Sequence, residues 1–196
     1  MPNWCNNILN VSGPKEDIAK FKAAANGPIQ TYNEFRAKDN SWPIHDDVRL
    51  KSLTQTLPEA GESDVFSFHA LYPVPEDFRR FPYDCQRAKK VGEVVGEPRP
   101  YGGYNWEINH WGCKWGAAEA SLWSHEDSFL QYGFDTAWSP PISFLEKVAS
   151  DWPTLSFTLE YSEPGMAFEG EAYFEGGEMM YDDTRPMEES EEEYDE

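Results

Sequence analysis

Apolar and polar side chains alternate along the first residues of the chain. In an extended chain, Cys5, Leu9 and Val11 fall on one side, whereas Trp4 and Ile8 fall on the other. A period of two residues is typical of a β-strand, so these residues are predicted to form one. The same alternation predicts three further strands and a final hairpin, at residues 65–72, 118–123, 128–138 and 155–175.

A first amphipathic helix is predicted directly after the opening strand, at residues 14–26. Ile18, Phe21 and Ala25 recur with the helical period and form one apolar stripe. Proline is favoured at the first helical position, and the Asn-Gly-Pro sequence that follows the stripe is a typical stop.

A second amphipathic helix is predicted at residues 139–152. Its apolar stripe consists of Ile142, Leu145 and Val148. Ser139 is expected to cap this helix, because a hydroxyl at that position accepts a hydrogen bond from one of the first free N–H groups. The helix is expected to end before the next proline in the sequence.

The remaining segments show no sustained period. Residues 28–63 and 76–117 are interpreted as insertions, the second with a helix at Tyr104–Trp111. The order of the elements is that of split β-α-β units, which form an antiparallel sheet with two helices on one face. The predicted fold class is therefore α+β, a ferredoxin-like sandwich in which residues 1–181 form a single domain.

The chain is strongly acidic, and its charge is unevenly distributed. The formal net charge is −20, and fifteen of the 36 acidic residues follow Ser156 together with a single arginine. Such a field repels phosphate groups, so nucleic acid is an unfavourable partner. Residues 182–196 contain too few apolar side chains to offset the entropy lost on ordering, so they are predicted to be a disordered acidic tail.

Several of these carboxylates gather on the outward side of the predicted final hairpin and just beyond it. They are candidates for a partner-binding acidic face, formed by Glu169, Glu171, Glu175, Glu178, Asp182 and Asp183. A face of this kind can imitate the charge of DNA and occupy a site meant for it. A solvated face that is acidic for solubility explains the same pattern, so both interpretations stand.

Four of the eight tryptophans lie within residues 106–123. Indole rings bury large areas, so these residues are expected first of all to fill the core. A second interpretation places Trp111, Lys114 and Trp115 on a glycine-flanked turn as an aromatic partner-binding surface, because tryptophan is an effective anchor. The two interpretations are compatible if one ring is buried and the next is exposed.

The same stretch contains the residues best suited to chemistry. Glu107 and His110 are three residues apart, the spacing that directs two metal ligands of one helix at one ion. The other histidines lie in three separate segments, so neither a metal nor another cofactor is expected. Cys113 has a lysine beside it, as an activated thiol requires, but it fits no cysteine-enzyme signature, and no catalytic residue is assigned.

Cysteine usage and the N-terminus bear on the compartment. Three cysteines at no metal-like spacing, together with an N-terminus without the features of a signal peptide, indicate a cytoplasmic protein. The apolar runs are too short to cross a bilayer, so no membrane partner is expected. The sequence leaves the oligomeric state open.

Several short motifs resemble a known family. They occur in the order "MPNWCNN", "LYPVP", "WGCKWGA", "FDTAWSPP" and "LEYSEPGMAFEGEAYF", from the first residue to about Gly177. The chain resembles the YubB-type family of phage- and plasmid-encoded proteins, whose C-terminal part is a ferredoxin-like domain. The resemblance implies this fold and a home on mobile elements, and it brings no activity, cofactor or catalytic residue with it.

These observations favour a non-catalytic, acidic phage or mobile-element protein. It would bind and block a host protein or protein complex in the host cytoplasm, such as one that handles nucleic acid or takes part in defence. One alternative is a single-stranded nucleic-acid-binding module that uses aromatic residues on the sheet, which the net charge opposes. Another is a small hydrolase or transferase centred on Glu107 and His110.

Overall fold

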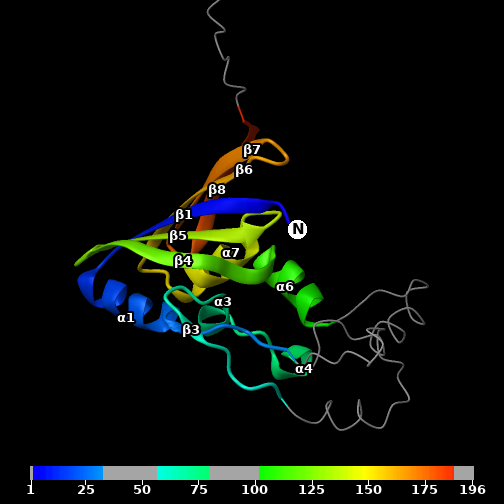
Figure 1. The fold of residues 1–196 in the computed structure, drawn as a ribbon. Helices are drawn as coiled ribbons and strands as arrows, with labels where there is room; N and C mark the ends of the chain where they lie inside the picture. The colour runs from blue at the N-terminus through cyan, green and yellow to red at the C-terminus, as the bar shows by residue number, and fades with distance from the viewer. Residues whose placement is uncertain (1, 33–56, 80–101, 188–196) are drawn as a thin grey trace, which may run out of the picture.

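The computed structural model describes residues 2–32, 57–79 and 102–187. Within these residues, six antiparallel strands form one sheet in the order β4-β5-β1-β6-β7-β8 (Figure 1). The strands of this sheet are β1 Trp4–Ser12, β4 Lys114–Glu126, β5 Phe129–Ala137, β6 Ser156–Glu163, β7 Phe168–Glu175 and β8 Glu178–Pro186. The helices are α1 Lys15–Ala25, α3 Phe68–Leu71, α4 Glu76–Arg79, α6 Gly103–Trp111 and α7 Ile142–Asp151.

The chain order of these elements produces the predicted ferredoxin-like arrangement. The succession β1-α1-β4-β5-α7-β6 is a pair of split β-α-β units, and in the sheet β1 lies between β5 and β6. The last two strands, β7 and β8, extend the sheet beyond β6. The α+β fold class and the antiparallel sheet predicted from the sequence are therefore confirmed.

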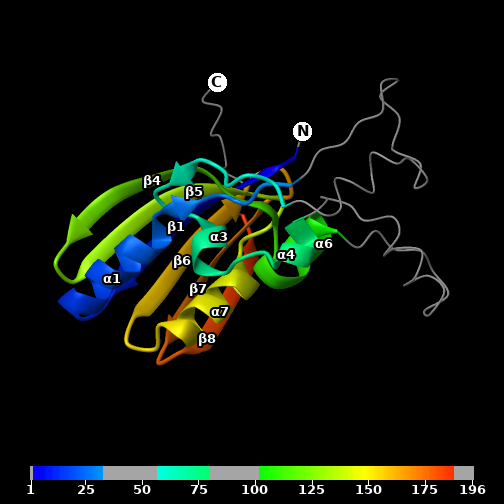
Figure 2. The same ribbon diagram turned by 90° about the horizontal axis from the view of Figure 1, so that it is seen from below.

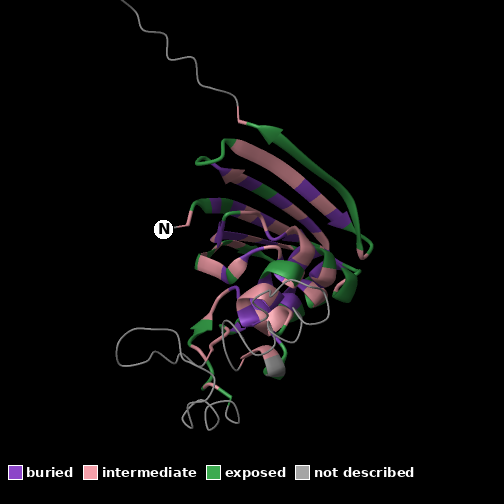
Figure 3. Cartoon of the chain, turned by 90° about the vertical axis from the view of Figure 1, so that its right-hand side faces the viewer, coloured by how far each residue is buried: buried purple, intermediate pink, exposed green. Residues whose placement is uncertain are grey.

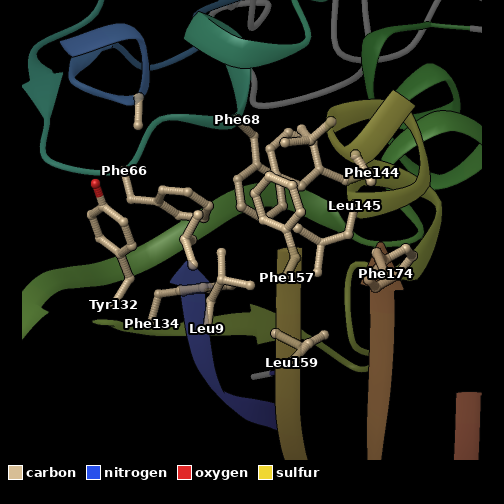
Figure 4. Packing of buried hydrophobic residues seen from close by; sticks show 14 of the residues in the cluster. Leu9, Phe66, Phe68, Tyr132, Phe134, Phe144, Leu145, Phe157, Leu159 and Phe174 are labelled. Atoms are coloured by element: carbon tan, nitrogen blue, oxygen red, sulfur yellow. The ribbon is translucent and has the colours of Figure 1, made fainter. Parts of the chain in front are cut away.

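The two predicted amphipathic helices cover the same face of the sheet (Figure 2). The apolar stripe of α1 is buried as expected, and Phe21 packs edge-on against Phe157 of β6, with ring centroids 5.4 Å apart. In α7, Leu145 and Val148 are buried, whereas Ile142 is partly exposed. Figure 4 shows how the apolar side chains of the strands meet those of the helices in this layer.

The second predicted helix begins later than expected. Its first residue is Ile142, and Pro141 precedes it without a capping side chain. The Oγ of Ser139 instead donates a hydrogen bond to the carbonyl oxygen of Gly112 at 2.7 Å. The predicted Ser139 cap is therefore wrong, because this hydroxyl connects the turn after α6 to the turn before α7.

Residues 65–72 do not form the predicted strand. They contain α3, whose N-cap Ser67 accepts a hydrogen bond through its Oγ from the backbone N–H of Ala70 at 3.1 Å. Phe66 and Phe68 are both buried, and Phe68 stacks on Phe144 of α7 at a centroid distance of 3.8 Å (Figure 4). The prediction is wrong because two aromatic side chains can enter one core from a capped turn as well as from a strand.

The last strand, β8, is absent from the sequence prediction. It pairs with β7 along its length, and all of its residues are exposed (Figure 3). The prediction of a disordered tail is therefore wrong for Asp182–Pro186, and residues 188–196 lie outside the described residues. An edge strand is held by backbone hydrogen bonds on one side, which the polar composition of Asp182–Arg185 does not reveal.

The predicted insertions are described only in part. The ends of the first are joined by a short ladder between β2 (Gly27–Pro28) and β3 (Ser63–Asp64), and residues 33–56 lie outside the described residues. The second contains the predicted helix, observed as α6, and residues 80–101 lie outside the described residues. Among the described helices, none has the length and apolar character needed to cross a membrane.

Candidate functional site

The face of the sheet opposite α1 and α7 is here called the open face, because none of the described helices lies on it (Figure 1). Side chains alternate across a strand, so the residues between the core positions, most of them polar, point to this face. On β1, β6, β7 and β8 the residues are Asn6, Ile8, Asn10, Thr158, Glu160, Ser162, Glu169, Glu171, Tyr173, Tyr181, Asp183 and Arg185.

Three carboxylates stand side by side across the open face. Glu160 of β6 lies directly opposite Glu171 of β7, and Glu171 lies directly opposite Asp183 of β8. These residues are called the carboxylate row. Like charges in directly opposed positions destabilise a sheet, so the row lowers the stability of the fold.

Neutral hydrogen-bond donors reach the carboxylate row from both sides. The hydroxyl of Tyr181 donates to Glu171, and the side-chain amide of Asn10 lies 3.5 Å from Glu160 Oε1. The hollow over this part of the face is also lined by Arg185, whose Nε forms an ion pair with Glu169 at 3.0 Å in the neighbouring cross-strand row. The hydrogen bonds that reach the row thus come from neutral groups.

A hollow lies over the carboxylate row. It has a volume of about 400 Å³, and its lining includes the three row residues together with Asn6, Ile8, Ser162, Glu169, Tyr181 and Arg185. A space of this size holds several side chains of a partner, and its lining combines four carboxylates with one guanidinium. The open face thus offers a hollow lined mainly by carboxylates, which suits the ammonium or guanidinium groups of a partner's side chains.

The six carboxylates predicted to form one acidic face are divided by the structure. Glu169, Glu171 and Asp183 lie on the open face. Glu175 and Glu178 are opposite each other in the strand register, beside the turn between β7 and β8. Asp182 points to the helix-covered side, because neighbouring residues of a strand face opposite ways.

The contacts of Asp182 agree with this position. Its Oδ1 accepts a hydrogen bond from the hydroxyl of Tyr161 at 2.6 Å, and Tyr161 belongs to the core side of β6. The predicted inclusion of Asp182 in the acidic face is therefore wrong. Sequence reasoning also missed Glu160 as a member of the site, although its place in the alternation of β6 was a usable signal.

A second feature lies where β1 begins and β5 ends. Trp4, Tyr104, Lys114, Trp115 and Trp138 form what is here called the aromatic corner. The ring of Trp115 is 6.3 Å from that of Trp4 and 5.4 Å from that of Trp138. Lys114 Nζ lies 5.4 Å from the Trp138 ring and 5.7 Å from the Tyr104 ring, within cation–π range.

The structure separates the three residues of the predicted aromatic surface. Trp111 is fully buried at the end of α6, with its ring edge-on to Phe68, so the prediction that it faces a partner is wrong. Trp115 is 37 % exposed and belongs, with Lys114, to the aromatic corner. Trp111 follows Glu107 by four residues, so both side chains lie on the buried side of α6. Trp115 lies beyond the helix, in β4.

Two tryptophans of the aromatic corner have left-handed backbone conformations. Trp115 has φ 72° and Trp138 has φ 67°, which bulky residues rarely adopt. Each is fixed by its own N–H: that of Trp115 donates to Glu107 Oε2 at 2.8 Å, and that of Trp138 donates to the carbonyl of Asn3 at 2.9 Å.

Glu107 is a buried structural carboxyl. Its side chain is fully buried, and its Oε1 accepts a hydrogen bond from the Tyr32 hydroxyl at 2.5 Å. Burial raises the pKa of Glu107 to about 7, against the opposing effect of its hydrogen bonds and of nearby Lys114. Both carboxylate oxygens are therefore engaged in holding the aromatic corner and the segment of Tyr32 together.

The predicted chemical pair does not converge on a ligand. His110 stacks on the Trp106 ring at 4.3 Å, and its Nδ1 lies 2.8 Å from the Trp106 carbonyl oxygen. Within the described residues, no group of three or more His, Cys, Asp or Glu side chains is placed to hold a metal ion. Burial raises the pKa of Cys113 well above its usual value, which favours the unreactive thiol.

Comparisons with known proteins agree with this architecture. Residues 118–196 match a family described as "Ferredoxin-like domain in Api92-like protein". The structure is similar to the crystal structure of protein Api92 from Yersinia pseudotuberculosis, with a TM-score of 0.59, and the match covers 96 % of this chain and 99 % of that chain. The sequence identity is 8 %. No curated protein matches the chain.

The range matched by the family begins within β4. It contains β5, α7 and the strands β6, β7 and β8, whereas β1 and α1 precede it and complete the pair of split β-α-β units. A sequence identity this low establishes a common fold only. The chain thus contains a ferredoxin-like domain similar to that of Api92-like proteins, and its fold is similar to that of Api92.

Proposed function

We propose that this protein is a non-catalytic binding protein whose open face docks on a basic surface of a protein partner. The carboxylate row carries the proposal. Three carboxylates in directly opposed positions cost stability, and the fold has no need of them, because their side chains point away from the core. Basic side chains of a partner would relieve the repulsion and turn this cost into binding free energy.

The biological setting is part of the same proposal. The sequence motifs are similar to those of phage- and plasmid-encoded proteins, so we infer a mobile-element protein that acts in the host cytoplasm. Its target would be a nucleic-acid-handling or defence complex, and the carboxylate row would imitate a line of phosphates. A partner that binds DNA through a basic groove has the matching charge.

The geometry gives less support to the two alternatives. A single-stranded nucleic-acid binder needs a groove of cations beside its aromatic platform. The aromatic corner has Lys114 beside its rings, but the hollow on the open face is lined by four carboxylates and one guanidinium. A hydrolase or transferase needs free acid and base groups facing one substrate. Glu107 is instead engaged with Tyr32 and Trp115, and His110 stacks on Trp106.

The test compares two triple variants with the wild type in capture experiments from host cytosol. The row variant, Glu160→Gln with Glu171→Gln and Asp183→Asn, removes the charge of the row and keeps its shape. The control variant, Glu16→Gln with Glu62→Gln and Glu146→Gln, removes the same charge from exposed positions elsewhere. We expect the wild type and the control to capture the same protein, and the row variant to lose it.

Competition defines what is captured. We expect added double-stranded DNA to displace the captured protein, and we expect high salt to weaken the complex, since the contact is between charges. Capture that is equal for the row variant and the control would contradict the proposal. If added DNA does not displace the captured protein, the result would still support binding to a protein partner but would contradict the imitation of DNA.

A further inference from the structure

The two edges of the sheet differ in regularity. The β4 edge is interrupted by three register shifts against β5, and Trp115 and Glu119 have left-handed backbone conformations within it. Bulges of this kind prevent another strand from pairing with an edge. The β4 edge is therefore closed to strand addition.

The opposite edge, β8, is more regular. Its pairing with β7 has a single register shift near the start, and from Tyr181 to Pro186 each residue faces its partner in sequence. Every β8 residue is exposed, and among the described residues no strand pairs with its outer side (Figure 3). Alternate N–H and C=O groups of this strand consequently point outward, where an extended chain can pair with them.

The side chains of this edge select what can pair with it. Asp183 points to the open face and Asp182 to the other side, so the edge has a carboxylate on each face, and its one cation, Arg185, is paired with Glu169. A second copy of β8 that placed Asp183 opposite Asp183 would bring like charges together across the new pair, which is destabilising, and Arg185 is already paired with Glu169 of the same chain. Charged residues protect many edges from self-association, and acidic ones leave this edge accessible to a basic strand.

We propose that β8 accepts an extended basic segment of the partner as an additional strand of the sheet. The inference rests on the proposed function and names the form in which the partner docks. A residue opposite Asp183 would continue the cross-strand row of Glu160 and Glu171, and its basic side chain would lie beside these carboxylates on the open face. Its neighbour in the segment would point to the side of Asp182, so two adjacent Lys or Arg residues fit the edge.

The test uses a short synthetic peptide with a central Lys-Arg pair flanked by Thr and Val residues. Strand pairing uses the backbone N–H groups of alternate residues, so two N-methylated versions are made, one methylated on each alternate set. We expect the unmodified peptide and one methylated version to bind, and the other to bind at least about tenfold more weakly, since it loses several hydrogen bonds. The protein itself is unchanged in this comparison.

Amide hydrogen exchange provides the second readout. With the unmodified peptide, we expect slower exchange at alternate amides between Tyr181 and Arg185. Strand addition would be overturned if both methylated versions bound equally and β8 exchange were unchanged, or if the unmodified peptide did not bind. Docking on the open face would then still be tested by capture with the row variant. Slower β8 exchange with equal affinity for the wild type and the row variant would support strand addition and contradict the role of the carboxylate row.

Discussion

At the scale of single residues, Glu107 shows how one buried carboxyl organises a surface. It accepts hydrogen bonds from the Tyr32 hydroxyl and the Trp115 N–H, and so holds a left-handed tryptophan in the aromatic corner. The charge of Lys114 lowers the pKa of Glu107, and the charge of Glu107 in turn raises the pKa of Tyr32 and of Cys113. Burial raises its pKa to about 7, so its proton is bound in folded protein at moderately acid pH.

This raised pKa predicts a pH-dependent stability. Between about pH 4.5 and about pH 7, the folded protein keeps the Glu107 proton, whereas the unfolded chain has released it. The contribution of Glu107 to the free energy of unfolding is therefore largest below pH 4.5 and falls through this range, by on the order of 3 kcal/mol.

Glu107→Gln isolates this effect, because an amide can still accept from Trp115 N–H and can donate to the Tyr32 oxygen. We expect urea unfolding at pH 5 and pH 8 to show that the wild type loses stability relative to the variant as the pH rises. A stability difference that stays constant across this range would contradict the raised pKa.

The sequence identifies the residues of this region without assigning a catalytic role to any of them. A hydrolase or transferase centred on Glu107 and His110 is one alternative from the sequence; in the structure Glu107 is buried against the Tyr32 hydroxyl and His110 stacks on the Trp106 ring. The burial of Glu107 depends on Tyr32, 75 positions away in the chain, and no local pattern reports such a contact. The left-handed conformation of Trp115 was likewise not predictable, since glycine is the residue that normally signals it.

At the scale of elements, the predictable parts are those with a buried and an exposed side. The sequences of β1, β5, β6, β7, α1 and α7 each show their period, because one side must be apolar to build the core. The short α3 and the edge strand β8 lack such a period. The first is fixed by the Ser67 cap and aromatic packing, and the second by backbone pairing with β7.

The position of β8 predicts the result of shortening the chain. A chain that ends at Tyr181 loses the pairing of Asp182–Pro186 with β7, and the Tyr161 hydroxyl loses its contacts with Asp182 and Thr184. We expect the domain to remain folded, since β8 contributes no buried residue, but to lose about 2–4 kcal/mol of stability from the broken hydrogen bonds.

The matched control for this experiment is a chain that ends at Met187, which retains the pairing of β8 with β7. Thermal unfolding of the two shortened chains gives the comparison. A melting temperature that is the same for both would show that the pairing of Asp182–Pro186 contributes no stability.

At the scale of the whole molecule, the two faces of the sheet differ in composition and role. One face is covered by α1 and α7 and supplies the core, whereas the open face carries the carboxylate row and its hollow. The sequence predicted that carboxylates would gather in this part of the chain. It did not predict the row, because its members come from three strands whose register is known only from the sheet.

The carboxylate row also predicts a gain in stability on neutralisation. Removing the charges of Glu160, Glu171 and Asp183 relieves two directly opposed pairs, so we expect the row variant to be more stable than the wild type by up to about 1 kcal/mol. Urea unfolding at low salt measures this difference, and the control variant corrects for the change in net charge. A row variant less stable than the control would show that the row supports the fold.

The most direct test of the central claim is the affinity of the captured partner for wild type and row variant over a range of salt concentrations. If the carboxylate row is the docking site, the wild-type affinity falls steeply with salt, and the row variant binds weakly with a shallower dependence. The control variant is expected to bind almost as tightly as the wild type, with a small loss of affinity from its less negative net charge. Equal affinities and equal salt dependences for the wild type and the row variant would contradict the account.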